Sequence, residues 1–245
     1  MSKLLLDCRQ GHAVSQFRVN GWRPQIVHTS LHGRKPVEAE VKAVIEKHPD
    51  DQLVILDIEH WKLPGDMDEA IQVVDWIREV KPQLRVGFYG IIPQVAYWPS
   101  ITRGQSEQKW KQYNASLGRS RNAKGHFDAR GLIDVVDFVA PCLYSFYANT
   151  GTWDHESLWF SNYAPATIEA CRDYQKEVYP FIWQRVHPGG KGGPILPDAH
   201  FAAQIKYCLD NADGVCIWDW ADTKTGTDVL ARTSAVMKEF GKQPT

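Results

Sequence analysis

The chain has 245 residues, 43% of them hydrophobic and 23% charged, which is enough apolar material to bury the core of a folded domain. Its formal net charge of -1 gives no general excess of the basic residues that bind nucleic acid. Five cysteines without a CxxC pair or zinc-binding spacing argue against a disulfide framework and a structural zinc site.

The N-terminal segment contains only three leucines before Asp7, too few for a secretory signal or a membrane span. We therefore expect a cytoplasmic protein, or a secreted one whose signal has been removed. Within residues 1–24 the pattern predicts one strand, over residues 3–7. We expect a monomer with neither nucleic acid nor membrane as a partner.

Short apolar runs then alternate with longer amphipathic segments. The runs are β-branched and continuous, which is typical of parallel strands covered on both faces. They cover residues 25–30, 53–59, 85–90, 135–144, 178–184 and 214–218. Apolar residues at helical spacing predict helices over residues 36–47, 67–81, 105–117, 155–175, 198–211 and 227–240.

This alternation predicts one α/β domain over residues 1–245, because strand–helix–strand units form parallel sheets. Six strands, with residues 3–7 as a seventh, suit a parallel β/α (TIM-like) barrel of seven or eight strands. A doubly wound open sheet is the alternative. No glycine-rich phosphate loop follows any predicted strand, which favours the barrel.

Two carboxylates follow the clearest of the predicted strands. In a strand, Asp57 and Glu59 point to the same side, about 6.5 Å apart at about 3.3 Å per residue. Active sites of β/α barrels form at the C-terminal ends of the strands, so this pair is the leading catalytic candidate. Two adjacent carboxylates repel when both are ionised, so the pKa of one should rise and give the acid that a glycosidase needs. A capping or salt-bridging role is the alternative.

Aromatic and polar residues end the other predicted strands. The chain has ten Trp, nine Tyr and nine Phe, and the apolar face of an indole suits the C–H face of a sugar ring. The sequence therefore predicts a sugar site. Its candidate substrate-binding residues are Trp61, Tyr89, Tyr144, Ser145, Tyr147, Arg185, Trp218 and Asp219.

Several of these segments carry a resemblance. The segment from Leu56 to Trp61 resembles the D-W-E-x-W segment of the animal and venom hyaluronidase family. Residues 87–93 are similar to its G-[FY]-Y-x-x-P segment, and residues 143–147 to its L-Y-P-S-x-Y segment without the proline. Residues 215–218 resemble its closing strand, and Arg185 falls where many members have an arginine. The likeness extends over roughly residues 25–240.

This resemblance implies a distorted β/α barrel, often of seven strands, and an endo-acting retaining hydrolase of an N-acetylhexosamine-containing polysaccharide such as hyaluronan. The mechanism it implies is substrate-assisted. Glu59 would protonate the glycosidic oxygen and later deprotonate water, while the acetamido oxygen of the substrate attacks the anomeric carbon. Asp57 would orient the acetamido group, Tyr89 and Tyr147 would hydrogen-bond it, and Trp218 would pack against its methyl. No metal or organic cofactor is implied.

The chain departs from the family beside the carboxylates, where His60 and Lys62 replace an acidic residue and an arginine. It is also shorter than typical members and lacks their disulfide pattern. Three alternatives stay open. One is a glycosidase that uses Asp219 or Asp222 as a second carboxylate and needs no N-acetyl group. The others are a metal-dependent hydrolase using some of the nine histidines and a glycan-binding barrel without catalysis.

Overall fold

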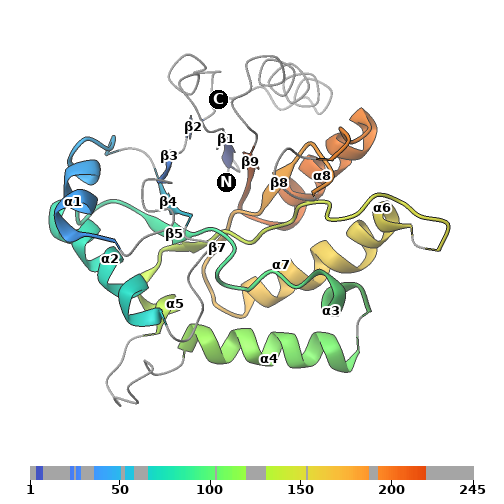
Figure 1. The fold of residues 1–245 in the computed structure, drawn as a ribbon, viewed down its shortest axis with the longest axis horizontal. Coiled ribbons are helices and arrows are strands. Elements are labelled where there is room, and N and C mark those ends of the chain that lie inside the picture. Colours follow the sequence, from blue (N-terminus) through green and yellow to red (C-terminus); the bar gives the residue numbers. More distant parts are fainter. Residues whose placement is uncertain are drawn as a thin grey trace.

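A computed structural model describes residues 4–7, 23–24, 26–28, 36–50, 53–57, 66–102, 104–119, 131–152, 154–187 and 193–218. Strands and helices alternate along these residues, with the strands in the centre (Figure 1). The strands are β1 (Leu4–Asp7), β2 (Arg23–Pro24), β3 (Ile26–His28), β4 (Val54–Leu56), β5 (Val86–Phe88), β6 (Phe138–Val139), β7 (Glu177–Val178), β8 (Phe181–Trp183) and β9 (Gly214–Trp218).

The helices surround these strands, with α1 and α2 on one side, α8 on the other, and α4 beyond α7 (Figure 1). They are α1 (Glu38–Glu46), α2 (Met67–Val80), α3 (Tyr97–Thr102), α4 (Gln105–Arg119), α5 (Leu132–Val135), α6 (His155–Leu158), the π-helical turn η3 (Trp159–Tyr163), α7 (Ala164–Arg172) and α8 (Asp198–Asn211). None of the helices described is both long and apolar enough to cross a membrane. The predicted helix over residues 227–240 lies outside the described residues.

Each predicted strand contains an observed one, and the mixed α/β fold with parallel strands is confirmed. One predicted boundary is wrong, because Val135 ends helix α5 instead of starting a strand. The first turn of α5 is closed by Asp134, whose Oδ2 accepts a hydrogen bond of 2.7 Å from the Gly131 N–H. The short helix α3 was not predicted.

All strand ladders among the described residues are parallel and form three small sheets, ordered β2-β1-β9-β8, β3-β4-β5 and β6-β7. The described ladders do not close into the predicted barrel of seven or eight strands. Isolated bridges continue the pairing from Tyr89 to Ala140 and from Cys142 to Phe181. The ladder breaks at this second junction because Pro141 has no N–H to donate.

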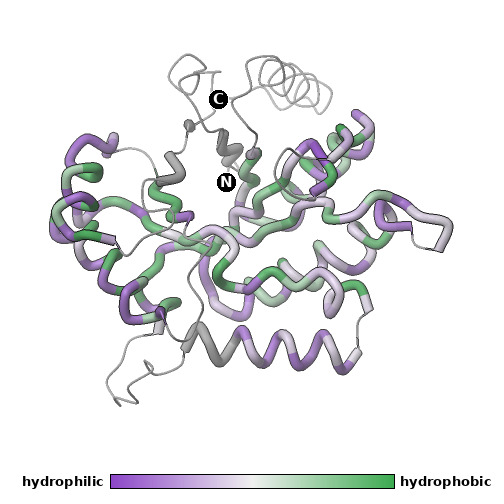
Figure 2. Tube along the Cα trace, in the orientation of Figure 1, coloured by the Kyte–Doolittle hydropathy of each residue, from purple (hydrophilic) through white to green (hydrophobic). Residues whose placement is uncertain are grey.

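In β4 and the later strands, side chains alternate between the two faces. One face packs against the helices and includes Val54, Leu56, Val86, Phe88, Leu143, Ile182 and Ile217. The other face forms a second cluster, here called the inner cluster. It consists of Leu53, Ile55, Phe138, Ala140, Cys142, Tyr144, Tyr179, Phe181, Trp183 and Cys216, with Tyr89, Phe146 and Trp218 packed against it. Because both faces are covered, the strands read as continuous apolar runs, as Figure 2 shows for the central strands.

The four cysteines that the structure describes, Cys142, Cys171, Cys208 and Cys216, are buried free thiols. Burial raises the pKa of the Cys171 and Cys208 thiols well above the usual value of 9.0. These thiols therefore stay protonated and serve as small apolar side chains.

Gly87 faces the inner cluster, and we predict that Gly87→Ala destabilises the fold. A Cβ atom at this position would lie 2.4 Å from Cε2 of Phe138, whose side chain is fully buried. Since the ring has no free space to move into, we expect a loss of about 1–3 kcal/mol in the free energy of unfolding. Urea denaturation measures this, with Gly151→Ala as control because nothing lies within 4 Å of the added methyl there. Equal midpoints for both variants would contradict the packing described for Gly87.

Candidate functional site

Asp57 directly follows β4 and is 7% exposed. Leu53 and Ile55 belong to the inner cluster, so the period of two along the strand places Asp57 on the same side. The backbone N–H of Tyr89 donates a hydrogen bond of 2.9 Å to the carbonyl of Leu56, which sets Tyr89 beside Asp57 on the neighbouring strand. A buried carboxylate and a phenol thus lie side by side at the C-terminal ends of β4 and β5.

The Tyr89 ring is held within the inner cluster. Its hydroxyl donates to Sγ of Cys142 at 3.2 Å, and its ring centroid is 4.8 Å from that of Phe181 and 6.0 Å from that of Tyr144. Burial raises the pKa of Tyr89 well above 10.0, and Cys142 and Tyr144 raise it further. The phenol therefore keeps its proton and remains a hydrogen-bond donor.

Gly90 allows the chain to turn directly after Tyr89. Its φ of +65° lies in the left-handed region, which glycine adopts without steric cost. Its N–H donates to the carbonyl of Ala140 at 2.9 Å, so the turn stays attached to the neighbouring segment. This explains why a glycine, Gly90, directly follows Tyr89 in the sequence.

An aromatic group extends the site across the ends of the next strands. The ring of Tyr144 is 5.8 Å from Trp183 and 5.9 Å from Trp218, and the two indoles are 4.9 Å apart in an edge-to-face arrangement. His187 stacks on Tyr144 at 6.0 Å. Tyr144 and Trp183 are buried, whereas Trp218 is half-buried and so keeps part of its indole accessible. These rings offer apolar faces on the same side of the strands as the Asp57 carboxylate.

Two buried side chains fix the segment that carries Tyr144. The Tyr163 hydroxyl donates to the carbonyl of Cys142 at 2.6 Å, and the Trp159 indole N–H donates to the carbonyl of Leu143 at 2.9 Å. Both donors come from η3, a turn behind the strands. The aromatic group therefore rests on a backbone held from the helical side.

The structure places Ser145 and Tyr147 apart from this group. Ser145 Oγ accepts a hydrogen bond of 2.9 Å from Nε2 of Gln204 on α8, on the opposite side of the strand from Tyr144. Tyr147 is 42% exposed, and its hydroxyl accepts a hydrogen bond of 3.2 Å from the indole N–H of Trp98. Arg185 follows β8, where it pairs with Ile195 in an antiparallel bridge.

Of the predicted site residues, Asp57, Tyr89, Tyr144 and Trp218 are therefore brought to one side of the strands. Glu59, Trp61 and Asp219, together with the alternative carboxylate Asp222, lie outside the described residues.

Trp183 was not predicted as a site residue. It could have been found from its spacing, since it lies two residues after Phe181 and so faces the same side. His187 stacks on Tyr144 through a turn that strand periodicity does not describe. Within the described part of the chain, no three His, Cys, Asp or Glu side chains gather where they could hold a metal ion.

Comparison with known proteins bears on the fold. No model of a known protein family and no curated protein matches the sequence. Bee venom hyaluronidase in complex with a hyaluronic acid tetramer matches with a TM-score of 0.51 and 14% identity, covering 78% of this chain and 67% of that one. A monoclinic crystal of bee venom hyaluronidase matches with a TM-score of 0.45 and 14% identity, covering 93% and 73%. A DUF72 family protein from Enterococcus faecalis has a TM-score of 0.40 and 8% identity, covering 96% and 94%.

The first of these similarities indicates a distant hyaluronidase-like fold. At 14% identity it does not assign the chain to a family. It agrees with the resemblance that the motifs of the sequence carry.

Two buried histidines, His155 on α6 and His200 on α8, make stability depend on pH. Burial lowers the pKa of His155 and of His200 below 6.5, an effect that Asp154 partly offsets for His155 and Glu156 for His200. His155 Nδ1 lies 2.7 Å from the Tyr97 hydroxyl, whose own pKa burial raises to about 12. The phenol therefore donates to a neutral imidazole.

We predict that the free energy of unfolding falls as the pH drops from 7.5 to 5.5. In the unfolded chain these histidines take up protons at about pH 6.5, whereas in the folded chain they do so only at lower pH. Stability is therefore lost as the pH falls from about 6.5 to their lowered pKa values. Urea denaturation at the two pH values measures the slope, which the double variant His155→Gln/His200→Gln should reduce. The same slope in both proteins would contradict the assignment.

Proposed function

We propose that the chain is a retaining glycoside hydrolase that cleaves an N-acetylhexosamine-containing polysaccharide, with Glu59 as general acid and base. The observation that carries the proposal is the buried carboxylate of Asp57 at the end of β4, beside Tyr89 and on the same side of the strands as the aromatic group of Tyr144, Trp183 and Trp218. The similarity in fold to bee venom hyaluronidase, which was crystallised with a hyaluronic acid tetramer, supports a carbohydrate as the ligand.

The proposed mechanism is substrate-assisted. The acetamido oxygen of the substrate attacks the anomeric carbon while Glu59 donates a proton to the leaving oxygen, and Glu59 then removes a proton from the attacking water. Asp57 stabilises the positive character that develops on the acetamido nitrogen. Tyr89 keeps its proton and can turn it from Sγ of Cys142 to the acetamido group, and the half-buried Trp218 offers its ring to the methyl.

Tyr144 takes the second tyrosine position in this proposal. Its ring lies 6.0 Å from that of Tyr89, whereas Tyr147 packs against Tyr97 and Trp98. The motif resemblance had given that position to Tyr147.

We also infer that the strands form a seven-stranded β/α barrel in which β2 and β3 are two parts of one strand, as are β7 and β8. Ladders join β1 with β2, β3 with β4, β4 with β5, β6 with β7, β8 with β9, and β9 with β1. Single bridges complete the series: Tyr89, after β5, pairs with Ala140, after β6, and Cys142 pairs with Phe181 of β8. The inner cluster draws side chains from β4, β6, β8 and β9 into one group, as the interior of a barrel does.

The test is incubation of the wild type and Glu59→Gln with oligosaccharides of hyaluronan, chondroitin and chitin, with products read by mass spectrometry. We expect hydrolysis products from the wild type only. Cleavage of a glycan without N-acetyl groups would favour a mechanism with a second carboxylate at Asp219 or Asp222. Binding of these glycans without cleavage of any of them would contradict the hydrolase proposal.

A further inference from the structure

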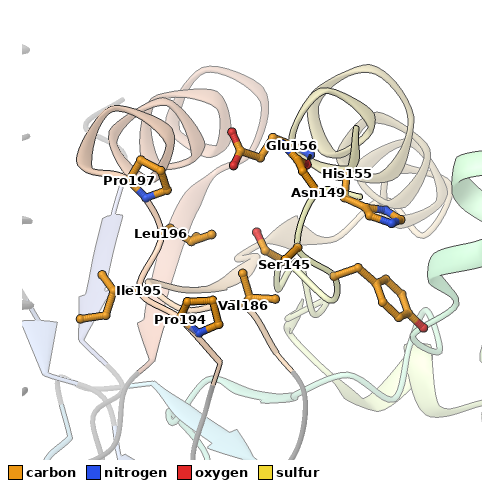
Figure 3. A pocket seen from close by; sticks show the side chains of 11 residues that line it. Ser145, Asn149, His155, Glu156, Val186, Pro194, Ile195, Leu196 and Pro197 are labelled. Atoms are coloured by element: carbon orange, nitrogen blue, oxygen red, sulfur yellow. Dashed lines mark hydrogen bonds between the residues drawn. The ribbon is translucent and has the colours of Figure 1, made fainter. Parts of the chain in front are cut away.

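A cavity of about 120 Å³ opens between the segments that follow β6 and β8, on the far side of the strand that carries Tyr144. Ser145, Asn149 and Glu156 line one side, and Val186, Ile195 and Leu196 line the other (Figure 3). All of these residues follow β6 or β8, so the cavity lies at the same ends of the strands as Asp57. One side of the cavity is polar and the other is apolar. This matches a sugar ring, whose hydroxyl groups are polar and whose C–H faces are apolar.

The size of the cavity fits one substituent of a sugar. At about 30 Å³ per water molecule, 120 Å³ is room for about four waters. An acetamido or hydroxymethyl group fits this space, while the ring that bears it stays at the mouth.

An exposed aromatic pair adjoins the cavity through Tyr147 and could receive such a ring. Tyr147 lines the cavity, and its ring is 5.2 Å from that of Trp98, with an angle of 44° between the planes. Trp98 is 43% exposed and Tyr147 is 42% exposed, so both rings keep part of their surface accessible. The indole N–H of Trp98 donates to the Tyr147 hydroxyl, so the pair has a fixed arrangement.

The charge of the cavity selects among sugars. Of the described residues that line it, Glu156 is the one carboxylate, and no lysine or arginine is among them. The Glu156 backbone N–H donates to Oδ1 of Asn149 at 2.9 Å, and Oε2 lies 3.6 Å from Nδ1 of the buried His200. Two like charges about 4 Å apart repel by about 1 kcal/mol in water and by about 4 kcal/mol near a protein surface. A uronate carboxylate in this cavity would meet that repulsion, whereas an acetamido or an ammonium group would not.

We propose that this cavity and the Trp98–Tyr147 pair form a subsite for a hexosamine ring without a carboxylate. The polysaccharide cleaved then places a hexosamine, acetylated or deacetylated, and not a uronate in this position. This inference rests on the proposed function and names the substrate class of that site.

The experiment measures the affinity of the Glu59→Gln protein for three tetrasaccharides by isothermal titration calorimetry: chitin, fully deacetylated chitin, and hyaluronan. We expect both chitin-derived tetramers to bind more tightly than hyaluronan. Glu156→Lys, introduced into the Glu59→Gln protein, should weaken binding of the cationic tetramer and strengthen binding of hyaluronan. Each affinity should change by about fivefold, which corresponds to about 1 kcal/mol. Trp98→Ala should weaken the binding of all three tetramers.

The matched control is Glu46→Gln, an exposed carboxylate on α1 that should change none of the affinities. Glu156 is 44% exposed and Trp98 is 43% exposed, so these variants should keep the fold, which circular dichroism checks. Tighter binding of hyaluronan than of chitin by the parent protein would overturn the subsite, as would Glu156→Lys leaving all three affinities unchanged. If binding depended on Glu156 but the wild type cleaved none of the glycans, the subsite proposal would hold and the hydrolase proposal would be refuted.

Discussion

Glu59→Gln should reduce kcat for glycan hydrolysis by about 10²–10⁴-fold, because a positioned proton donor contributes about that much to a rate. The amide keeps the size of the side chain and cannot donate the acidic proton, so substrate affinity should change little. Steady-state kinetics on the glycan that the wild type cleaves gives kcat and KM separately. Full activity of the variant would refute the role proposed for Glu59.

The control for this variant is Glu46→Gln, which makes the same chemical change at an exposed position on α1. It should retain the wild-type kcat. Glu59 is proposed from the sequence, in which it stands two residues after Asp57, and it lies outside the described residues. Equal losses in both variants would point to an effect of the glutamine substitution on folding.

Helices with a clear apolar period and a strong boundary could be predicted from the sequence. Residues 198–211 were predicted as a helix and form α8 (Asp198–Asn211), since Pro197 ends the preceding segment. Helix α3 escaped prediction because Tyr97 and Trp98 are weak helix formers and Pro99 usually interrupts helices. Tertiary contacts supply what the local sequence lacks, for Asn162 donates to the carbonyl of Ile101 at the end of α3.

The candidate site could be predicted where a strand carries its residues, and less well where a loop does. Tyr89 and Trp218 end strands and join the inner cluster as expected. Ser145 was chosen for its chemical type, yet the period of two directs it away from Tyr144 and toward Gln204. Tyr147 lies beyond the last bridged residue of its segment, so strand periodicity no longer determines its direction, and its position depends on packing against Trp98.

Asp57→Asn should lower kcat by about 10²-fold, since removal of one preorganised group that stabilises developing charge costs about 10²–10³. Asp57 is 7% exposed, and asparagine has nearly its shape, so the loss should come from charge and not from packing. The pH profile should also move. Without the negative charge of Asp57, Glu59 loses its proton more readily, and the basic limb of the rate profile shifts to lower pH.

The pH dependence of kcat/KM for the wild type and Asp57→Asn measures this shift. Asp210→Asn is the matched control, because it removes an exposed carboxylate on α8 whose ion pair with Lys206 should add little to stability. It should leave both the rate and the profile unchanged. If Asp57→Asn lost activity with an unshifted profile, the two carboxylates would not be coupled, and Asp57 would act by position alone. Since the proposed acid depends on the repulsion between Asp57 and Glu59, that outcome would remove the physical reason for assigning the proton donor to this pair.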